Sequence, residues 1–318
     1  DNGTSGGNGN LTTLTQHVDS TTMRETDFEY DWRNRRIVTD GEIDFYEVLV
    51  YDNLNRVVQA NRYDTDAEGN LIARAETKYD NRGRVYQSIR YAVDPDTGTI
   101  GNSLVDNTWY DANGNVIKSL PAGSKLFTKS VYDSLGRRTA AYTGYDLDES
   151  TYSEAGTLEG DTILEQAETL YDNASNVLQT TQRLRYHDAP ATQTGPLQNP
   201  ATTPKARVLY AASWNDPLGR SIALADYGSN WGTGGVVFPP PPAMIPASSD
   251  TVLVSLTTYN NTGEVSETTD PAGLVTCYEY DDLGRETARI MNCVGSSSSS
   301  SSATLGSGCE DSADTNIT

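Results

Sequence analysis

The chain is poor in the residues from which catalytic and membrane-spanning sites are usually built. Its 318 residues include 2 histidines, 3 cysteines and 3 methionines. Only His17 and His187 could act as general bases near neutral pH, and neither has a Ser-Gly or Cys context typical of an activated nucleophile. No apolar run approaches the length of about 18 residues that a transmembrane helix needs. These shortages predict a protein that is not an enzyme and does not span a membrane.

Basic residues are also scarce. Lys and Arg number 23 against 44 Asp and Glu, so the net charge is −21 at pH 7 and the pI is near 4.3. A charge of this sign disfavours nucleic acid and anionic membranes as partners, because both repel an acidic surface. It is compatible with an extracellular, salty or calcium-bearing setting.

Apolar residues make up 36% of the chain, and 19 tyrosines stand against 4 phenylalanines. This composition suits a thin, two-sided sheet with shallow burial better than a thick globular core. The N-terminus carries neither a charged-then-apolar leader nor an initiator Met. We therefore expect a processed form or a segment of a longer protein.

What the chain has in quantity is one recurring motif. An aromatic residue is followed by Asp or Asn, a short polar run, often a Gly and often an Arg. A motif that recurs with constant character indicates a repeat architecture. The residues assigned to these turns are Tyr30, Asp31, Tyr51, Asp52, Tyr79, Asp80, Gly83, Arg84, Tyr110, Asp111, Gly114, Tyr132, Asp133, Gly136, Arg137, Tyr171, Asp172, Trp214, Gly219, Arg220, Tyr259, Gly263, Tyr280, Asp281, Gly284 and Arg285.

The residues on either side of each motif alternate in polarity, which predicts β-strands. After the third copy, for example, Val85, Gln87 and Ile89 fall on one face and the residues between them on the other. Within the motif, Asp can cap the backbone as an Asx-turn, and Gly supplies the positive φ of a tight hairpin loop. A single hairpin is marginal in water, so each hairpin is expected to stack on its neighbours.

The predicted fold is therefore all-β, with stacked hairpins that form an elongated or spiralling sheet, as a strip, shell or solenoid-like body. Helix should be very scarce, and residues 161–169, the most helix-like stretch, are also expected to form a strand. After the turn, the Arg is expected to lie along its neighbours or to pair with a carboxylate one repeat away.

These motifs resemble those of the YD-repeat, or RHS-repeat, family, and the resemblance covers roughly residues 30–290. Copies 79–84, 132–137 and 280–285 follow the Tyr-Asp-x-x-Gly-Arg pattern closely, and residues 270–273 resemble its paired half-motif. Some copies depart from it. Asn55 and Asn176 are assigned to the Gly position, Trp214-Asn215 to the Tyr-Asp position, and Glu264 to the Arg position.

The resemblance implies a large secreted or surface protein whose repeats wind into a strip or a hollow shell. Such shells enclose a C-terminal toxin or mediate cell contact. Toxin carriers of the family end in a core-closing region with an autoproteolytic Asp, and no matching segment is found here. The resemblance is therefore to the repeat region, without the toxin-carrying C-terminal part.

The chain divides by composition into three parts. Residues 1–10 are a flexible leader, residues 11–290 are the YD-repeat body, and residues 291–318 are a Ser-rich tail. Two insertions, 186–205 and 226–250, are expected to be irregular and to project from the body. The second contains Trp231, Phe238 and four consecutive prolines, which could bind a glycan or a protein.

Three weaker sites remain open. A disulfide is predicted between Cys293 and Cys309, with Cys277–Cys293 as the next alternative. Asp64, Asp66 and Glu68 have the 1-3-5 spacing of a calcium loop, although Ala75 stands where the bidentate carboxylate belongs. No other cofactor is expected. Asn173 and Asn260 lie in glycosylation sequons within predicted turns.

The leading hypothesis is a non-enzymatic extracellular or cell-surface structural protein. It would form part of a fibre, shell or matrix and assemble through strand edges and inserted loops, as a homo-oligomer or as part of a longer chain. The first alternative is an adhesin that binds glycans or proteins, and the second is a fragment of a toxin-enclosing RHS shell.

Overall fold

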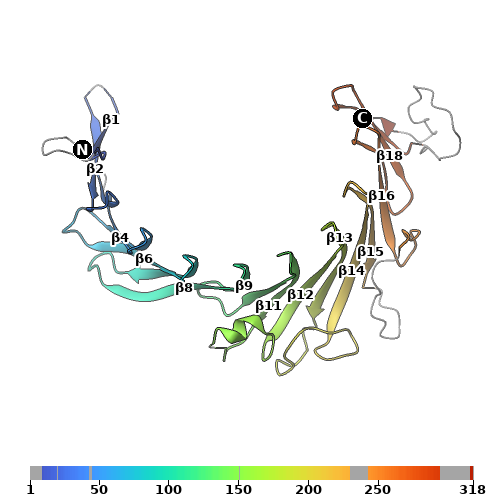
Figure 1. Ribbon diagram of the computed structural model, residues 1–318, viewed down its shortest axis with the longest axis horizontal. Helices are drawn as coiled ribbons and strands as arrows, with labels where there is room; N and C mark the ends of the chain where they lie inside the picture. The colour runs from blue at the N-terminus through green and yellow to red at the C-terminus, as the bar shows by residue number, and fades with distance from the viewer. Residues whose placement is uncertain are drawn as a thin grey trace. The chain divides into compact units, whose positions relative to one another are not determined.

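The computed structural model describes residues 9–19, 21–42, 45–149, 151–229 and 243–293, and the backbone of 316–317. The chain folds almost entirely as antiparallel β-sheet (Figure 1), which confirms the predicted fold class. Two compact units are distinguished. The first comprises Asp1–Lys129 and Leu147–Thr157, and the second Ser130–Asp146 and Leu158–Thr318.

In the first unit each strand pairs antiparallel with the next one in the sequence. A short 3-10 helix, η1 (Ser153–Gly156), is the one helical segment within the described residues. The strands are β1 (Thr13–His17), β2 (Met23–Tyr30), β3 (Arg36–Gly41), β4 (Phe45–Tyr51), β5 (Val57–Tyr63), β6 (Leu71–Tyr79), β7 (Val85–Val93), β8 (Ile100–Tyr110) and β9 (Val116–Leu120), followed by the start of β10 (Phe127–Tyr132).

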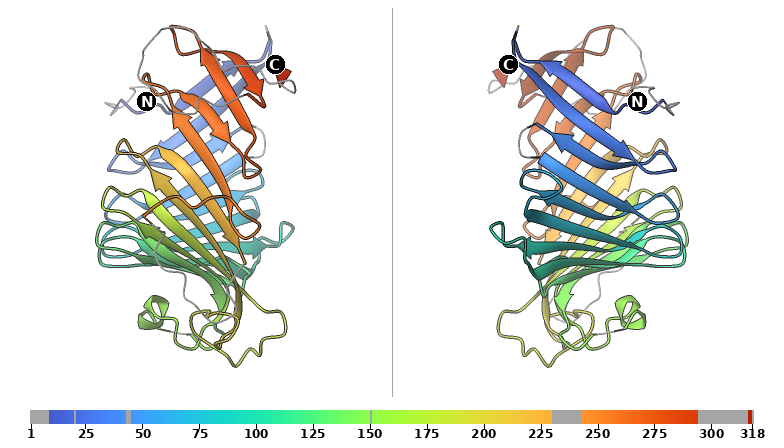
Figure 2. Two further views of the ribbon diagram at one scale, coloured as in Figure 1. Left: turned by 90° about the vertical axis from the view of Figure 1, so that its right-hand side faces the viewer. Right: turned by 90° about the vertical axis from the view of Figure 1, so that its left-hand side faces the viewer.

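In the second unit, too, each strand pairs antiparallel with the next one in the sequence, as the views of Figure 2 show for its green to red strands. Of the segment 161–169, residues 162–169 lie in a strand, as predicted. The strands are β11 (Arg138–Tyr145), β12 (Thr162–Tyr171), β13 (Val177–Arg185), β14 (Ala206–Asn215), β15 (Ser221–Gly228), β16 (Leu253–Tyr259), β17 (Val265–Thr269), β18 (Val275–Tyr280), β19 (Glu286–Met291) and β20 (Asn316–Ile317).

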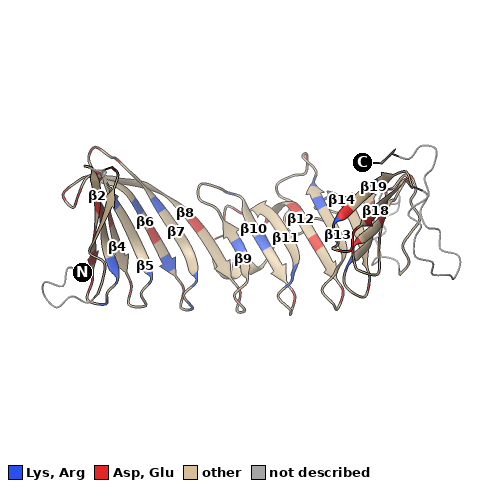
Figure 3. Cartoon of the chain, turned by 90° about the horizontal axis from the view of Figure 1, so that it is seen from above, with Lys and Arg blue, Asp and Glu red and all other residues tan. Residues whose placement is uncertain are grey.

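Every YD turn joins an even-numbered strand to the odd-numbered strand that follows it. Within each unit the turns therefore lie along one edge of the sheet (Figure 3), here called the YD edge. At most of these turns the register slips by one residue at the aromatic position. Glu29 lies opposite Val38, for example, whereas Tyr30 lies opposite Arg36. Such a bulge places one turn residue at positive φ, as seen at Gly83 (φ 82°) and Asn55 (φ 64°).

Most of the sheet is a single layer with half-buried side chains, as the composition predicts. Deep burial occurs locally in both units. In the second unit it accompanies the insertion 186–205, which is irregular but does not simply project. Its Leu197 is 1% exposed and donates its backbone N–H to the buried Gln166 side chain at 2.8 Å. The Arg183 guanidinium reaches the carbonyl of Gln198 at 3.1 Å. The insertion is thus held against strands β12 and β13 by hydrogen bonds.

The disulfide joins Cys277 to Cys293, so the prediction of a Cys293–Cys309 bond is wrong. Cys277 lies in β18 opposite Ile290 of β19, and the chain then turns at Asn292 (φ 58°). That turn brings Cys293 back over β18, where its N–H donates to the Val275 carbonyl at 3.2 Å. The two Cα atoms are then 6.2 Å apart, within the usual range for a disulfide.

Several sequence predictions fall outside the described residues. Trp231, Phe238 and the four prolines of the second insertion lie there, as do Cys309 and most of the Ser-rich tail. The second insertion begins only after Gly228, because β15 extends that far.

Candidate functional site

The recurring feature of the structure is the YD turn, and the turn around Asp80 shows its construction. The Asp80 N–H donates to the Arg84 carbonyl at 2.9 Å, and the Gly83 N–H donates to the Asp80 carbonyl at 3.0 Å. One carboxylate oxygen of Asp80 accepts the backbone N–H groups of Arg82 and Arg84 at 2.8 and 3.0 Å. The other accepts the Arg84 Nε at 2.7 Å. The Asp side chain thereby accepts hydrogen bonds from backbone N–H groups of the loop and at the same time holds the Arg side chain in place.

From this fixed position the Arg side chain reaches the next turn along the YD edge. The Arg84 guanidinium lies 4.4 Å from the ring centroid of Tyr110, and its Nη1 donates to the Asp111 carbonyl at 3.2 Å. The Tyr110 hydroxyl donates back to the Val85 carbonyl at 2.8 Å. Two consecutive hairpins are thus linked in both directions, by a cation–π contact and by hydrogen bonds.

The same contact recurs wherever a turn arginine is followed by a turn tyrosine in the same unit. We call this series the Arg–Tyr ladder. Its rungs are Arg35–Tyr51, Arg56–Tyr79 and Arg84–Tyr110 in the first unit, and Arg137–Tyr171 and Arg220–Tyr259 in the second, with guanidinium-to-centroid distances of 4.7, 4.3, 4.4, 4.7 and 4.1 Å. The expectation that the Arg pairs with a carboxylate one repeat away is wrong. Its carboxylate belongs to its own turn, and it contacts the next turn through a ring and, at several rungs, a backbone carbonyl.

Two turns replace the Arg by Asn and keep the internal bond. Asn115 Nδ2 donates to Asp111 at 2.9 Å, and Asn176 Nδ2 donates to Asp172 at 2.8 Å. Asn176 therefore occupies the Arg position, and Ser175 (φ 71°) occupies the Gly position, which corrects the sequence assignment.

A further turn replaces Tyr by Asn215, rather than by Trp214 as assigned from the sequence. Asp216 is the turn carboxylate, since its N–H donates to the Arg220 carbonyl at 2.9 Å. Asn215 Nδ2 donates to the Val177 carbonyl at 3.3 Å. It thereby makes the type of contact that a tyrosine hydroxyl makes in the other repeats.

The turn at 260–264 carries two linked changes. Glu264 stands at the Arg position, where it would repel an aspartate four residues earlier. The residue there is Asn260, whose uncharged Oδ1 accepts the backbone N–H groups of Gly263 and Glu264 at 2.8 and 2.9 Å. The loop is therefore kept and the like-charge contact is avoided.

Hydrogen bonding lowers the pKa values of the turn carboxylates. The side chain of Arg35 is the largest cause at Asp31, and the backbone N–H of Arg84 is the largest at Asp80. Asp172 and Asp281 also have lowered pKa values. Hydrogen bonds to the charged form of a carboxyl group favour that form.

We expect the thermal midpoint to fall steeply at acid pH. A pKa lowered in the folded state stabilises the fold fully above the unfolded value of 3.8, and this stabilisation is lost as the pH falls through the folded pKa. Calorimetry between neutral pH and about pH 2 would show the loss mainly below about pH 4. Asp80→Asn with Asp133→Asn should make the fall shallower. A midpoint that stays constant down to the lowest pH would contradict this explanation.

We also expect Arg84→Lys to lower the thermal midpoint by about 2–4 °C, the shift typical of losing one modest contact in a domain of this size. Lys cannot bond Asp80 in a bidentate manner and stack on Tyr110 at the same time. The exposed Arg24 of β2 is a control in the same unit, and Arg24→Lys should leave the midpoint unchanged in differential scanning fluorimetry. Equal shifts for the two variants would show that the ladder contributes nothing.

A buried ionic cluster in the first unit was missed by sequence reasoning. Lys118 and Lys129 are 4% and 3% exposed, and their ammonium groups lie 2.6 and 3.2 Å from one carboxylate oxygen of Glu149. Lys129 also donates to the carbonyls of Glu154 and Thr157, at the η1 segment. Figure 1 shows η1 beside the strand region from which these lysines come. No local pattern signals such a cluster, because its members are about 10 to 30 residues apart in the sequence.

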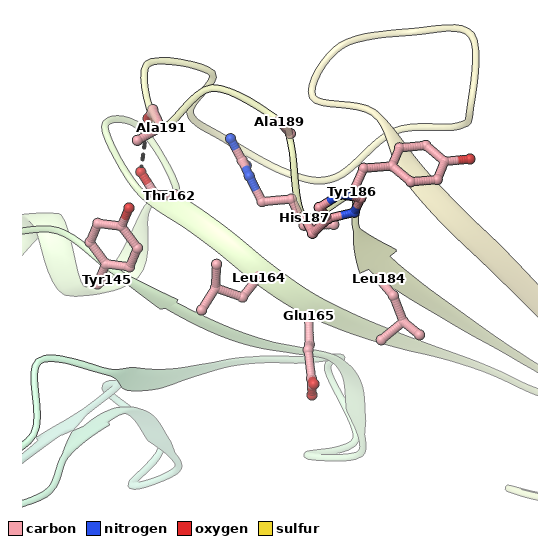
Figure 4. Close-up of a pocket in the computed structure, with 10 residues that line it drawn as sticks. Tyr145, Thr162, Leu164, Glu165, Leu184, Tyr186, His187, Ala189 and Ala191 are labelled. Atoms are coloured by element: carbon pink, nitrogen blue, oxygen red, sulfur yellow. Dashed lines mark hydrogen bonds between the residues drawn. The ribbon is translucent and has the colours of Figure 1, made fainter.

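A pocket of about 340 Å³ lies in the second unit where the insertion leaves β13 (Figure 4). Tyr145 and Tyr186 stand at its opposite sides, and His187 lies between them. Its main polar groups are used by the chain itself. Thr162 donates to the Ala191 carbonyl at 3.1 Å, and Arg185 donates to three backbone carbonyls. The pocket therefore follows from the attachment of the insertion.

The weaker sequence-predicted sites lie in turns. Asp64 and Asp66 cap the β5–β6 turn by accepting the backbone N–H groups of Asn70 and Glu68 at 2.8 and 2.9 Å. Among the described residues, their carboxylates and that of Glu68 do not converge as a metal site would require. Asn173 is exposed at the tip of its turn, whereas Asn260 is half-buried.

Comparison with known proteins gives a family match over a short part of the chain. The RHS repeat family model matches residues 259–291, which include the turn at 260–264 and the disulfide strand β18. No curated protein matches the chain. Among solved structures, 84% of this chain aligns with 17% of a chain in the TcdB2–TccC3 crystal structure, at 13% identity and a TM-score of 0.28.

A Photorhabdus luminescens Tc holotoxin pore aligns over 84% of this chain and 16% of its own, at 12% identity and a TM-score of 0.25. The chain thus spans about a sixth of the length of the chains it matches. Residues 259–291 match the RHS repeat, which confirms over this segment the RHS-repeat (YD-repeat) resemblance predicted from the Tyr-Asp motifs.

Proposed function

We propose that the chain is a non-enzymatic structural scaffold, a YD-repeat sheet that forms part of an extracellular or cell-surface fibre, shell or matrix. The Arg–Tyr ladder is the observation that carries this proposal. It links successive hairpins through side chains, in addition to the backbone pairing of their strands. Such a link resists the separation of neighbouring hairpins, which a load-bearing sheet requires.

The electrostatics of the turns support a role without catalysis. Turn carboxylates such as Asp80 and Asp133 are each bonded to backbone N–H groups and to an arginine. Their hydrogen bonds and lowered pKa values favour the ionised form, which suits a permanent anion rather than a group that transfers protons. His17 lies exposed in β1, far in sequence from the pocket of His187.

A disulfide and an acidic surface support an extracellular location. The Cys277–Cys293 bond persists most readily in an oxidising compartment. The net charge of −21 keeps separate copies apart at low ionic strength, so assembly is expected to need salt or a bridging ligand. Within the described residues, no helix has the length and apolarity to cross a membrane.

Negative-stain electron microscopy of the purified chain tests this proposal. We expect filaments or rods built from several copies once salt screens the acidic surface, and dispersed particles at low salt. Single, compact particles under every salt concentration would contradict the proposed scaffold.

A further inference from the structure

Leucines stand at the tips of four YD turns, at the residue that precedes the positive-φ position. These tip leucines are Leu54, Leu135, Leu218 and Leu283, and they are 70%, 68%, 77% and 77% exposed. A single exposed leucine is common on protein surfaces. The presence of leucine at the same turn position in four separate repeats requires an explanation, particularly in a chain of low apolar content.

The turn itself does not require leucine at its tip. Asn113 and Thr262 occupy the same position in two other turns. In the turn of Asn113, the Asp111 N–H donates to the Asn115 carbonyl at 2.9 Å, as in the leucine-bearing turns. In the turn of Thr262, the corresponding distance from the Asn260 N–H to the Glu264 carbonyl is also 2.9 Å. The leucine side chains are therefore free to serve contacts outside the turn.

The tip leucines occur only on turns whose Asp is neutralised by its own Arg. The turns that carry Leu54, Leu135 and Leu218 contain the ion pairs Asp52–Arg56, Asp133–Arg137 and Asp216–Arg220, with N–O distances of 2.6, 2.7 and 2.7 Å. Asp281–Arg285, at 2.7 Å, accompanies Leu283. Turns without this pair, at 111–115, 172–176 and 260–264, carry Asn113, Ala174 and Thr262 instead of leucine. Two further paired turns, at 31–35 and 80–84, carry Arg33 and Arg82 at the tip. Leucine tips therefore occur only on turns whose charge is cancelled, but not on every such turn.

This coincidence identifies the partner. A chain with a net charge of −21 repels its own copies over most of its surface. Copies can approach where charge is paired and apolar atoms can leave water, which is the combination found at these tips. In the second unit, Leu135, Leu218 and Leu283 lie at alternate turns of the YD edge, so successive tips are four strands, or about 19 Å, apart. A row of this kind can be matched by the same row on another molecule.

We propose that the YD edge is a self-association surface, on which the tip leucines contact the YD edge of a second copy of this chain. The inference rests on the proposed scaffold function and names the surface through which the scaffold grows. It differs from assembly through strand edges or inserted loops, because the contacting groups are turn side chains.

Sedimentation velocity at low and high salt tests the proposal. The test variant carries Leu54→Thr, Leu135→Thr, Leu218→Thr and Leu283→Thr. Threonine is chosen because the chain already has it at one turn tip. The matched control replaces four half-exposed strand leucines in the same way, with Leu104→Thr, Leu170→Thr, Leu224→Thr and Leu253→Thr. Circular dichroism confirms that all three proteins are folded.

We expect the wild-type chain to associate at high salt, the tip variant to associate at least tenfold more weakly, and the control to stay within twofold of wild type. Equal association by the tip variant would overturn the inference and leave the scaffold intact. A wild-type chain that remains monomeric throughout would overturn both.

A second measurement identifies what the tips touch. A photo-crosslinking amino acid in place of Leu218 should give cross-links between copies that map to the turn segments 52–56, 133–137, 216–220 or 281–285. Cross-links to strand or insertion residues would overturn edge-to-edge contact. Tip-dependent flotation with neutral phosphatidylcholine vesicles would show a lipid surface, not a second copy, to be the occupant.

Discussion

Replacing Glu149 by Gln should lower the free energy of unfolding by about 3–5 kcal/mol, the usual cost of breaking a buried ion pair by removing one partner. The Glu149 side chain is 4% exposed and lies within 3.2 Å of both the Lys118 and Lys129 ammonium groups. Gln keeps the shape of the side chain but removes its charge. The ion pairs that Glu149 makes with the Lys118 and Lys129 ammonium groups would then be lost.

Urea denaturation measures this loss, with Glu68→Gln, an exposed glutamate of the same unit, as the control. Adding Lys118→Met to Glu149→Gln should recover part of the stability. It removes one of the two buried cations, and a thioether can still pack on the Trp109 and Phe127 rings that Lys118 contacts at 4.7 and 4.9 Å. A Glu149→Gln variant no less stable than the control would show that the cluster is not coupled to folding.

Removal of the Cys277–Cys293 bond should lower the free energy of unfolding by about 3 kcal/mol, because the bond closes a loop of 16 residues in the unfolded chain. The variant pairs Cys277→Ala with Cys293→Ala, and the expected loss should equal that caused by reductant in the wild-type chain. Cys277 is fully buried and Cys293 is 6% exposed, so the native protein should resist reduction until it opens locally.

Peptide mapping under non-reducing conditions decides the pairing independently of stability. The peptide that contains Cys277 should be recovered linked to the one that contains Cys293. Recovery of a Cys293–Cys309 link, with Cys277 free, would contradict the structure and restore the prediction made from loop length alone.

The repeat turns could be predicted from the sequence because their determinants are local. Asp80, Gly83 and Arg84 are bonded to one another within five residues, so the pattern of residue types carries the geometry. The assignment failed by one position where a copy lacked both Gly and Arg, or the Tyr itself. Ser175 at positive φ and Asn215 in place of Tyr are residues whose roles depend on the preceding repeat.

Other features depend on contacts between distant segments and left no local pattern. The Lys118–Glu149 pair depends on the packing of the 147–157 segment against β9 and β10. The attachment of the insertion depends on Arg185 and Gln166, which lie in strands with ordinary alternation. The disulfide was predicted from a loop-closure argument that weighs two alternatives almost equally, whereas the register of β18 and β19 decided between them.

The direct link between consecutive hairpins is the central claim, and a double-mutant cycle between Arg84 and Tyr110 tests it most directly. With Arg84→Gln, Tyr110→Leu and the double variant, the free energies of unfolding should show a coupling of about 0.5–1 kcal/mol, the size of a half-exposed cation–π contact. A control cycle between Arg84 and Tyr63, which ends β5 at the edge opposite the YD turns, should give about zero within 0.3 kcal/mol. Additive effects in the Arg84–Tyr110 cycle would contradict the ladder as the link between repeats.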